Sequence, residues 1–224
     1  MTDTIHRGLP GARGVRIVPA ITLLALQTGC IGFQSYRFSE PIAPSPEARV
    51  SKGTLQLETN DVRLRVKAVN TQMYRDTVVI GYLPAWENVE APDYPLRVLV
   101  EIEPLAKGLT LDPTGFTYLG SDGSETKPRL AEVDGVSYDL AGLGRTGCGA
   151  KPSRSDDVRR RKRAGRLALD ESTWIRVHFP VSEDPRAQFT LRITGFCKGE
   201  SPVAVPPIHF KSATSRRFYM ATVN

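Results

Sequence analysis

Apolar and polar residues alternate along most of the chain from residue 53 onward. The clearest stretches are 62–68, 96–102 and 174–181, where apolar residues recur at every second position. A period of two places those side chains on one face of a β-strand. Each stretch is therefore predicted to be a strand with one buried face and one face toward solvent.

Shorter stretches of alternating or β-branched residues predict further strands, and turn sequences at 112–115 and 121–124 separate some of them. These shorter stretches are 77–83, 109–111, 116–119, 136–140, 188–196, 208–210 and 218–223. The set amounts to about nine strands. It predicts an all-β, antiparallel β-sandwich, with a small β-barrel as the alternative that strand number cannot exclude. The stretch LTLDPTGFTYLGSDG loosely resembles Ig-like sandwiches of bacterial envelope proteins.

Helical periodicity is confined to one segment. In residues 156–169 two aspartates precede a run of bases, the order that a helix dipole favours, but the apolar stripe is thin. The segment is predicted to be an exposed basic insertion loop, at about 141–170, that holds at most a short helix.

The first thirty residues have the layout of an export signal. A basic leader containing three arginines precedes a predominantly apolar stretch of ten residues at 17–26. Ten residues are too few to span a bilayer and suit the apolar core of a signal peptide.

The residues after this apolar core, LQTGC, resemble the lipobox of bacterial lipoprotein precursors. In that family a small residue, here Gly29, precedes a cysteine that is lipidated and becomes the mature N-terminus. The resemblance implies a signal peptide at 1–29 and a lipid anchor at Cys30. It also implies the outer membrane in a host that has one, because Ile31 stands where aspartate is associated with inner-membrane retention. The alternatives are an ordinary secretory signal and a buried first strand.

The segment after Cys30 is rich in serine and proline, including the sequence PSP at 44–46. That composition is typical of an extended linker. We therefore predict a flexible tether at 30–52 and a globular domain at 53–224.

Composition places the chain among ordinary globular proteins. It has 224 residues, of which 40% are hydrophobic and 24% charged, with a formal net charge of +6. Residues 151–166 alone carry eight basic and two acidic residues, so the positive charge belongs to this segment and not to the domain.

Five consecutive cations lie within that segment: Arg159, Arg160, Arg161, Lys162 and Arg163. An exported protein does not meet nucleic acid, and no aromatic residue interrupts the run to stack on bases. We therefore consider an anionic lipid or an acidic envelope polymer as the partner of this basic run. A solvated loop without a partner is the alternative.

Two thiols, those of Cys148 and Cys197, remain once Cys30 is lipidated. Two cysteines in an oxidising compartment predict one disulfide. Neither belongs to a C-x-x-C motif, so the pair gives no indication of redox chemistry.

Three aromatic residues, Tyr82, Trp86 and Tyr94, surround a proline-rich connection. Aromatic side chains on a loop can stack on sugars or enter a partner's pocket. The favoured interpretation is that they cover the open end of the sandwich, because large aromatic residues are mostly buried.

Catalytic and cofactor motifs lack their structural context. The GLGRTG sequence at 142–147 leads into glycine and proline instead of a helix, and SETK at 124–127 lies in a turn. His178 and His209 are the only histidines after residue 29, and neither belongs to a metal-binding motif. We predict no cofactor, no metal and no enzymatic activity. The expected function is that of an envelope lipoprotein that binds a protein or a glycan, or serves as a structural module. The alternative is an envelope hydrolase whose site forms only in three dimensions.

Overall fold

The computed structural model describes residues 30–80, 83–87, 95–143, 147–148, 165–182 and 184–221. These residues form eighteen strands in three antiparallel sheets, with one short 3-10 helix, η1 (Pro113–Gly115). No α-helix occurs in these ranges. The predicted all-β fold is confirmed, although many strands are shorter and more numerous than the nine expected.

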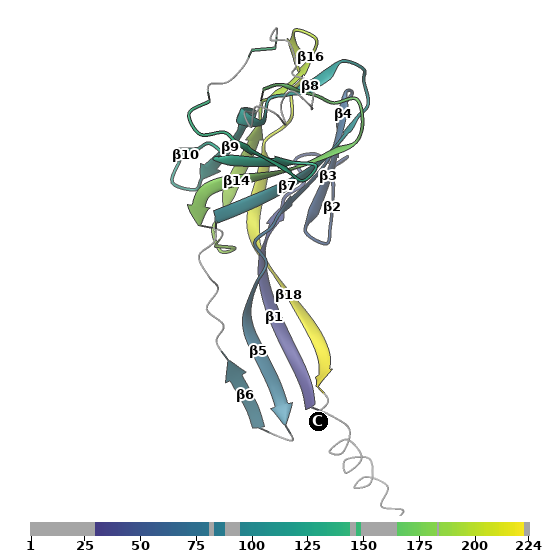
Figure 1. Cartoon of the computed structure of the whole chain (residues 1–224). Coiled ribbons are helices and arrows are strands. Elements are labelled where there is room, and N and C mark those ends of the chain that lie inside the picture. The colour runs from purple at the N-terminus through teal and green to yellow at the C-terminus, as the bar shows by residue number, and fades with distance from the viewer. Residues whose placement is uncertain are drawn as a thin grey trace, which may run out of the picture.

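Two seven-stranded sheets make up most of the molecule (Figure 1). Sheet A has the order β10-β9-β15-β18-β1-β5-β6, and sheet B has the order β12-β11-β14-β7-β4-β3-β2. The strands of sheet A are β1 (Cys30–Pro41), β5 (Gln72–Ile80), β6 (Leu83–Glu87), β9 (Phe116–Gly120), β10 (Glu125–Thr126), β15 (Phe189–Ile193) and β18 (Ile208–Ala221). Those of sheet B are β2 (Arg49–Ser51), β3 (Thr54–Glu58), β4 (Val62–Ala68), β7 (Pro95–Pro104), β11 (Leu130–Val133), β12 (Val136–Asp139) and β14 (Thr173–Ser182).

A small third sheet lies at one end of the sandwich. Sheet C has the order β13-β8-β16-β17, with strands β8 (Leu109–Leu111), β13 (Leu167–Ala168), β16 (Phe196–Lys198) and β17 (Ser201–Pro202).

The core lies between sheets A and B. The alternating apolar residues of β4 and β7 are buried, as are Ile175, Val177 and Phe179 of β14, in agreement with their period of two. Tyr118 of sheet A contacts Phe179 of sheet B and also stacks on Phe189, which in turn stacks on Phe210 with ring centroids 4.4 Å apart. The sheets are open, with unpaired edges among the described strands, so the fold is a sandwich and not the alternative closed barrel.

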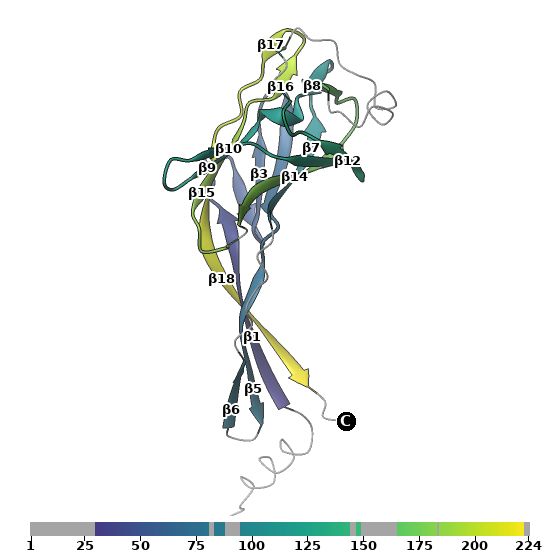
Figure 2. The same cartoon turned by 60° about the vertical axis from the view of Figure 1, so that its left-hand side comes forward.

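Sheet A extends well beyond the sandwich as a narrow ribbon, which we call the stalk (Figures 1 and 2). It comprises residues 30–37 of β1, β5, β6 and residues 214–221 of β18. Its tip holds the start of β1 and the end of β18, where Cys30 pairs with Ala221. Sheet C lies at the opposite end of the molecule.

The tether expected at 30–52 is corrected by this arrangement. Residues 30–41 form β1, which pairs with β18 along its whole length and with β5 from Ile31 to Arg37. Backbone hydrogen bonding to distant strands outweighs the local serine and proline content. A domain that began at residue 53 would lose the strand between β18 and β5.

A buried hydrogen-bonded pair joins the stalk to the sandwich. The Ser39 amide donates to Oδ1 of Asn70 at 3.0 Å, and Nδ2 of Asn70 donates to Oγ of Ser39 at 2.8 Å. Asn70 lies in the connection that leads the chain from β4 in sheet B to β5 in the stalk. The pair therefore fixes the point where β5 leaves the sandwich.

Two hairpins of sheet B use the same tight turn. Asp134 and Gly135 have φ of 46° and 82°, and Lys52 and Gly53 have φ of 51° and 73°. Two successive positive φ angles define the type I′ turn, whose twist matches that of paired strands. The strand predicted over 136–140 is therefore β12, the second strand of a hairpin whose first strand is β11.

The predicted basic loop is also shorter than expected. Its last residues, 165–170, contain β13 and three buried side chains, those of Arg166, Leu167 and Leu169. The helix that the charge pattern suggested over 156–169 is not present at its C-terminal end, where the chain is extended and pairs with β8. The rest of that helix, residues 156–164, lies outside the described residues.

Candidate functional site on the outer face of sheet B

The outer face of sheet B carries the side chains that alternate with the core residues. β14 contributes Trp174, Arg176 and His178, and these lie beside residues of β7 and β11 on the same face. From the remaining strands this face receives Glu132, Arg97, Leu99, Glu101, Glu103, Arg63, Arg65 and Lys67. Charged residues of both signs therefore cover most of the face.

Ion pairs across neighbouring strands hold part of this surface in place. Arg63 on β4 contacts Glu58 and Glu103, each at 2.7 Å, and Arg65 contacts Glu101 at 3.2 Å. These side chains are largely exposed, so each pair contributes little to stability. Their effect is to orient the carboxylates of β7 toward β4.

A more buried cluster centres on Glu132 of β11. Nη1 of Arg176 donates to Oε2 of Glu132 at 2.7 Å, and Nε2 of His178 lies 3.1 Å from Oε1 of the same carboxylate. This second contact is an ion pair when the imidazole is protonated. Burial lowers the pKa of His178, and the charges of Arg97 and Arg176 lower it further, against the opposing effect of Glu132.

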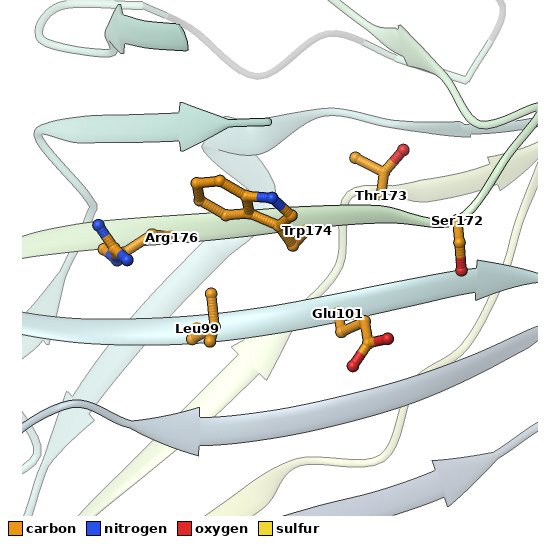
Figure 3. Close-up of a pocket in the computed structure, with 6 residues that line it drawn as sticks. All are labelled: Leu99, Glu101, Ser172, Thr173, Trp174 and Arg176. Carbon is orange, nitrogen blue, oxygen red and sulfur yellow. The ribbon is translucent and has the colours of Figure 1, made fainter. Parts of the chain in front are cut away.

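Beside this cluster the surface is hollowed by a depression of about 400 Å³ (Figure 3). Its lining residues are Leu99, Glu101, Ser172, Thr173, Trp174 and Arg176. The guanidinium carbon of Arg176 lies 5.5 Å from the centroid of the Trp174 ring, within the range of a cation–π contact. Because Glu132 holds Arg176, the partly exposed indole of Trp174 has a fixed neighbour on this side.

The depression is lined by both apolar and polar side chains. Leu99 and the indole of Trp174 offer apolar contact, while Glu101, Ser172 and Thr173 offer hydrogen-bond acceptors and hydroxyl donors. A partly exposed aromatic ring beside polar groups suits the recognition of a sugar ring or a peptide side chain. A second hollow of about 510 Å³, at the β2–β4 edge, is lined mainly by polar residues, including Glu47, Arg49 and Asn60.

The predicted disulfide is present. Cys148 and Cys197 form a disulfide, with Cα atoms 5.6 Å apart. The bond attaches Cys148, which precedes the basic residues 151–166, to β16. Cys30 is the first residue of β1. The five cations Arg159, Arg160, Arg161, Lys162 and Arg163 lie outside the described residues.

The three aromatic candidates do not cap the sandwich as a group. Tyr82 and Tyr94 lie outside the described residues. Trp86 belongs to β6, the outer strand of the stalk, where it pairs with Thr77. Its strand is therefore remote from the open end of the sandwich that it was expected to cover.

Neither histidine contacts a serine in the described parts of the chain. His178 contacts Glu132, and Nδ1 of the exposed His209 lies 2.8 Å from Oγ1 of Thr190. The alternation in 174–181 predicts that Trp174, Arg176 and His178 share the face opposite the core, but it does not mark Trp174 as a binding residue. Trp174 is recognisable because it is a large aromatic residue at a position of the alternation where the other side chains, Arg176 and His178, are polar.

No group of three or more potential metal ligands occurs among the described side chains. In the same residues no helix has both the length and the apolar character needed to cross a bilayer. Comparisons with models of known protein families, with curated proteins and with solved structures found no match.

Proposed function

We propose that the protein is a cell-envelope lipoprotein, attached to the membrane by a lipid on Cys30, whose β-sandwich acts as a non-catalytic binding module. One observation carries the proposal. Cys30, the cysteine of the lipobox-like sequence, is the first residue of β1 at the tip of the stalk (Figure 2). This position in the strand is remote from the core between sheets A and B.

The stalk gives the anchor a mechanical role. Seven residue steps separate Cys30 from Arg37, the last residue of β1 in the stalk. At about 3.4 Å per step the stalk spans about 24 Å. An anchored molecule therefore holds its sandwich, and the outer face of sheet B, clear of the bilayer surface. The identity of Ile31, through the same resemblance, favours the outer membrane.

The depression at Trp174 is the proposed contact site for an envelope glycan or protein. Its support is the combination of a partly exposed indole, an arginine positioned by Glu132, and the polar side chains of Glu101 and Ser172. Rigid aromatic and arginine side chains contribute most of the binding energy at many interfaces.

The basic segment is proposed to contact an anionic partner away from the anchoring membrane. Cys148, which precedes the basic segment, is bonded to β16, and the strand that follows the segment is β13. Both β13 and β16 belong to sheet C. Sheet C lies at the end of the molecule opposite the stalk tip (Figure 1). This position favours an acidic envelope polymer over the lipid headgroups beside Cys30.

The binding role is tested with the unlipidated mature chain, which we define as residues 30–224 with Cys30→Ser, produced in an oxidising compartment. The immobilised chain is exposed to an envelope extract, and retained glycans and proteins are identified. We expect a retained component that is lost with Trp174→Ala but kept with Leu105→Ala, which removes an exposed apolar side chain that does not line the depression. Equal retention by both variants would contradict the assignment of the site.

A further inference from the structure

The tip of the stalk has the composition of a surface that meets lipid. Phe218 on β18 is 72% exposed, the largest value among the exposed large apolar side chains of the described residues. It packs edge-to-face on Phe33 of β1, with ring centroids 4.9 Å apart. The ring is therefore held in a defined position while most of its surface faces outward.

Two cations precede Phe218 directly in the strand. Arg216 and Arg217 are both exposed, and neither forms an ion pair with a side chain that the structure describes. The Arg217 guanidinium lies 5.4 Å from the centroid of the Tyr36 ring, which orients it across the face of the ribbon. Successive residues of a strand point to opposite faces, so the two cations flank the ribbon on both sides.

All three side chains lie close to the tip of the stalk. Phe218 is three residues from Ala221, the partner of Cys30, and therefore about 10 Å from the tip. Arg217 and Arg216 follow at about 14 and 17 Å. A lipid on Cys30 places the tip at the boundary of the hydrocarbon, and interfacial protein segments enter the headgroup region by about 5–10 Å. A stalk that leans toward the bilayer therefore brings the ring to the headgroups and both guanidinium groups to the phosphates.

We propose that the stalk tip is a second membrane contact, in which Phe218, Arg216 and Arg217 bind the headgroup region of an anionic bilayer beside the lipid of Cys30. This inference rests on the proposed function, because the anchor defines which end of the molecule meets the membrane. Segments that lie at a membrane interface combine lysine or arginine with tryptophan, phenylalanine or leucine. The contact limits the tilt of the stalk and so sets the orientation of the outer face of sheet B.

The experiment measures vesicle binding without the lipid. The unlipidated mature chain, with Arg159 to Arg163 also replaced by serine, is floated with vesicles of 70% phosphatidylcholine and 30% phosphatidylglycerol. We expect binding that falls at least about tenfold with Arg216→Ser, Arg217→Ser and Phe218→Ser combined, since each cation near an anionic surface strengthens binding severalfold. Vesicles of phosphatidylcholine alone should bind both proteins weakly.

Two controls separate this contact from general charge attraction and from misfolding. Lys67→Ser with Lys107→Ser removes two exposed cations from the sandwich and should leave flotation unchanged. Phe218→Tyr keeps the packing on Phe33 and an interfacial aromatic ring, and should retain binding where Phe218→Ser weakens it. Unaltered flotation of the triple variant, or an equal loss in the lysine control, overturns the proposal.

The alternative partner for this surface of the stalk is a second copy of the chain. The outer edge of β18 pairs with β15 only at residues 208–210, so residues 211–221 have a free edge among the described strands. Sedimentation of the same proteins without vesicles addresses this alternative. A dimer that dissociates in the triple variant would assign the surface to self-association and refute the membrane contact. Because the assay uses a chain without the Cys30 thiol, its outcome is independent of whether Cys30 is lipidated.

Discussion

Arg166 donates a hydrogen bond from Nε to Oγ1 of Thr110 at 3.0 Å, and both residues are buried. The same guanidinium donates from Nη1 to the Gly147 carbonyl at 3.1 Å and from Nη2 to the Gly195 carbonyl at 3.3 Å. One side chain thus connects β8, the residue before Cys148 and the turn before β16. The last arginine of the basic segment is a structural residue of the core.

Replacement of Arg166 by methionine should lower the free energy of unfolding by roughly 3 kcal/mol, because buried acceptors then lose their donors. Urea unfolding of the unlipidated mature chain measures the change. Arg192→Met removes an equal charge from an exposed pair with Glu125 and should cost less than about 1 kcal/mol. Similar values for the two variants would mean that Arg166 does not hold this end of the sandwich together.

Removal of the disulfide with Cys148→Ala and Cys197→Ala should destabilise the fold by about 4 kcal/mol, the value that the loop-entropy model gives for a separation of 49 residues. Mass mapping of the non-reduced protein should show a peptide that joins the two cysteines. Reductant should lower the unfolding midpoint of the unaltered chain and leave that of the double variant unchanged. Two free thiols in protein produced in an oxidising compartment would refute the bond.

The sequence predicts those strands in which burial of one face produces a local alternation of apolar and polar residues. The alternation in 62–68, 96–102 and 174–181 appears as β4, β7 and β14 because one face of each strand is buried against the core. The disulfide was predictable because only Cys148 and Cys197 remain once Cys30 is assigned to the lipid. The basic face of β14 was also visible, but the depression at Trp174 depends on Leu99 and Glu101 from β7, which are adjacent only after folding.

Features that arise from distant partners were not predictable. The residues of β1 carry no clear alternation, and they become a strand because residues 210–221 lie beside them. The local composition assigns Arg166 to a charged loop. Its guanidinium nevertheless donates hydrogen bonds to the carbonyl groups of Gly147 and Gly195. Local composition therefore misplaced both the first strand and the end of the basic segment.

The stability of the sandwich should depend on the protonation of His178. Its pKa in the folded state is lowered, chiefly by burial, below the value of about 6.5 expected in the unfolded chain. The unfolded state therefore binds the proton first, and stability is full above about pH 6.5 and falls as the pH drops below it. Unfolding free energies measured from about pH 8 to 5 should fall less steeply with His178→Gln. His209→Gln is the matched control, and equal slopes for His178→Gln and the unaltered chain would disprove the linkage.

The replacement of Arg159 to Arg163 by serine should leave stability within about 0.5 kcal/mol, because the change stops short of the buried Arg166. The same change should lower the salt concentration at which the protein elutes from a dextran sulfate column. Fewer cations then bind the sulfate groups, and salt screens such solvent-exposed interactions. Equal elution would leave the segment as a solvated loop. Loss of folding would show that the five cations are part of the core.

The central claim is that Cys30 carries the lipid that anchors the stalk. Mass spectrometry of the N-terminal peptide, from protein extracted out of the membrane fraction of its native host, tests this claim most directly. The predicted result is a peptide that begins at Cys30, lacks residues 1–29 and carries the added mass of a thioether-linked diacylglycerol. A peptide with an unmodified Cys30 thiol, or an N-terminus at another residue, would contradict the account.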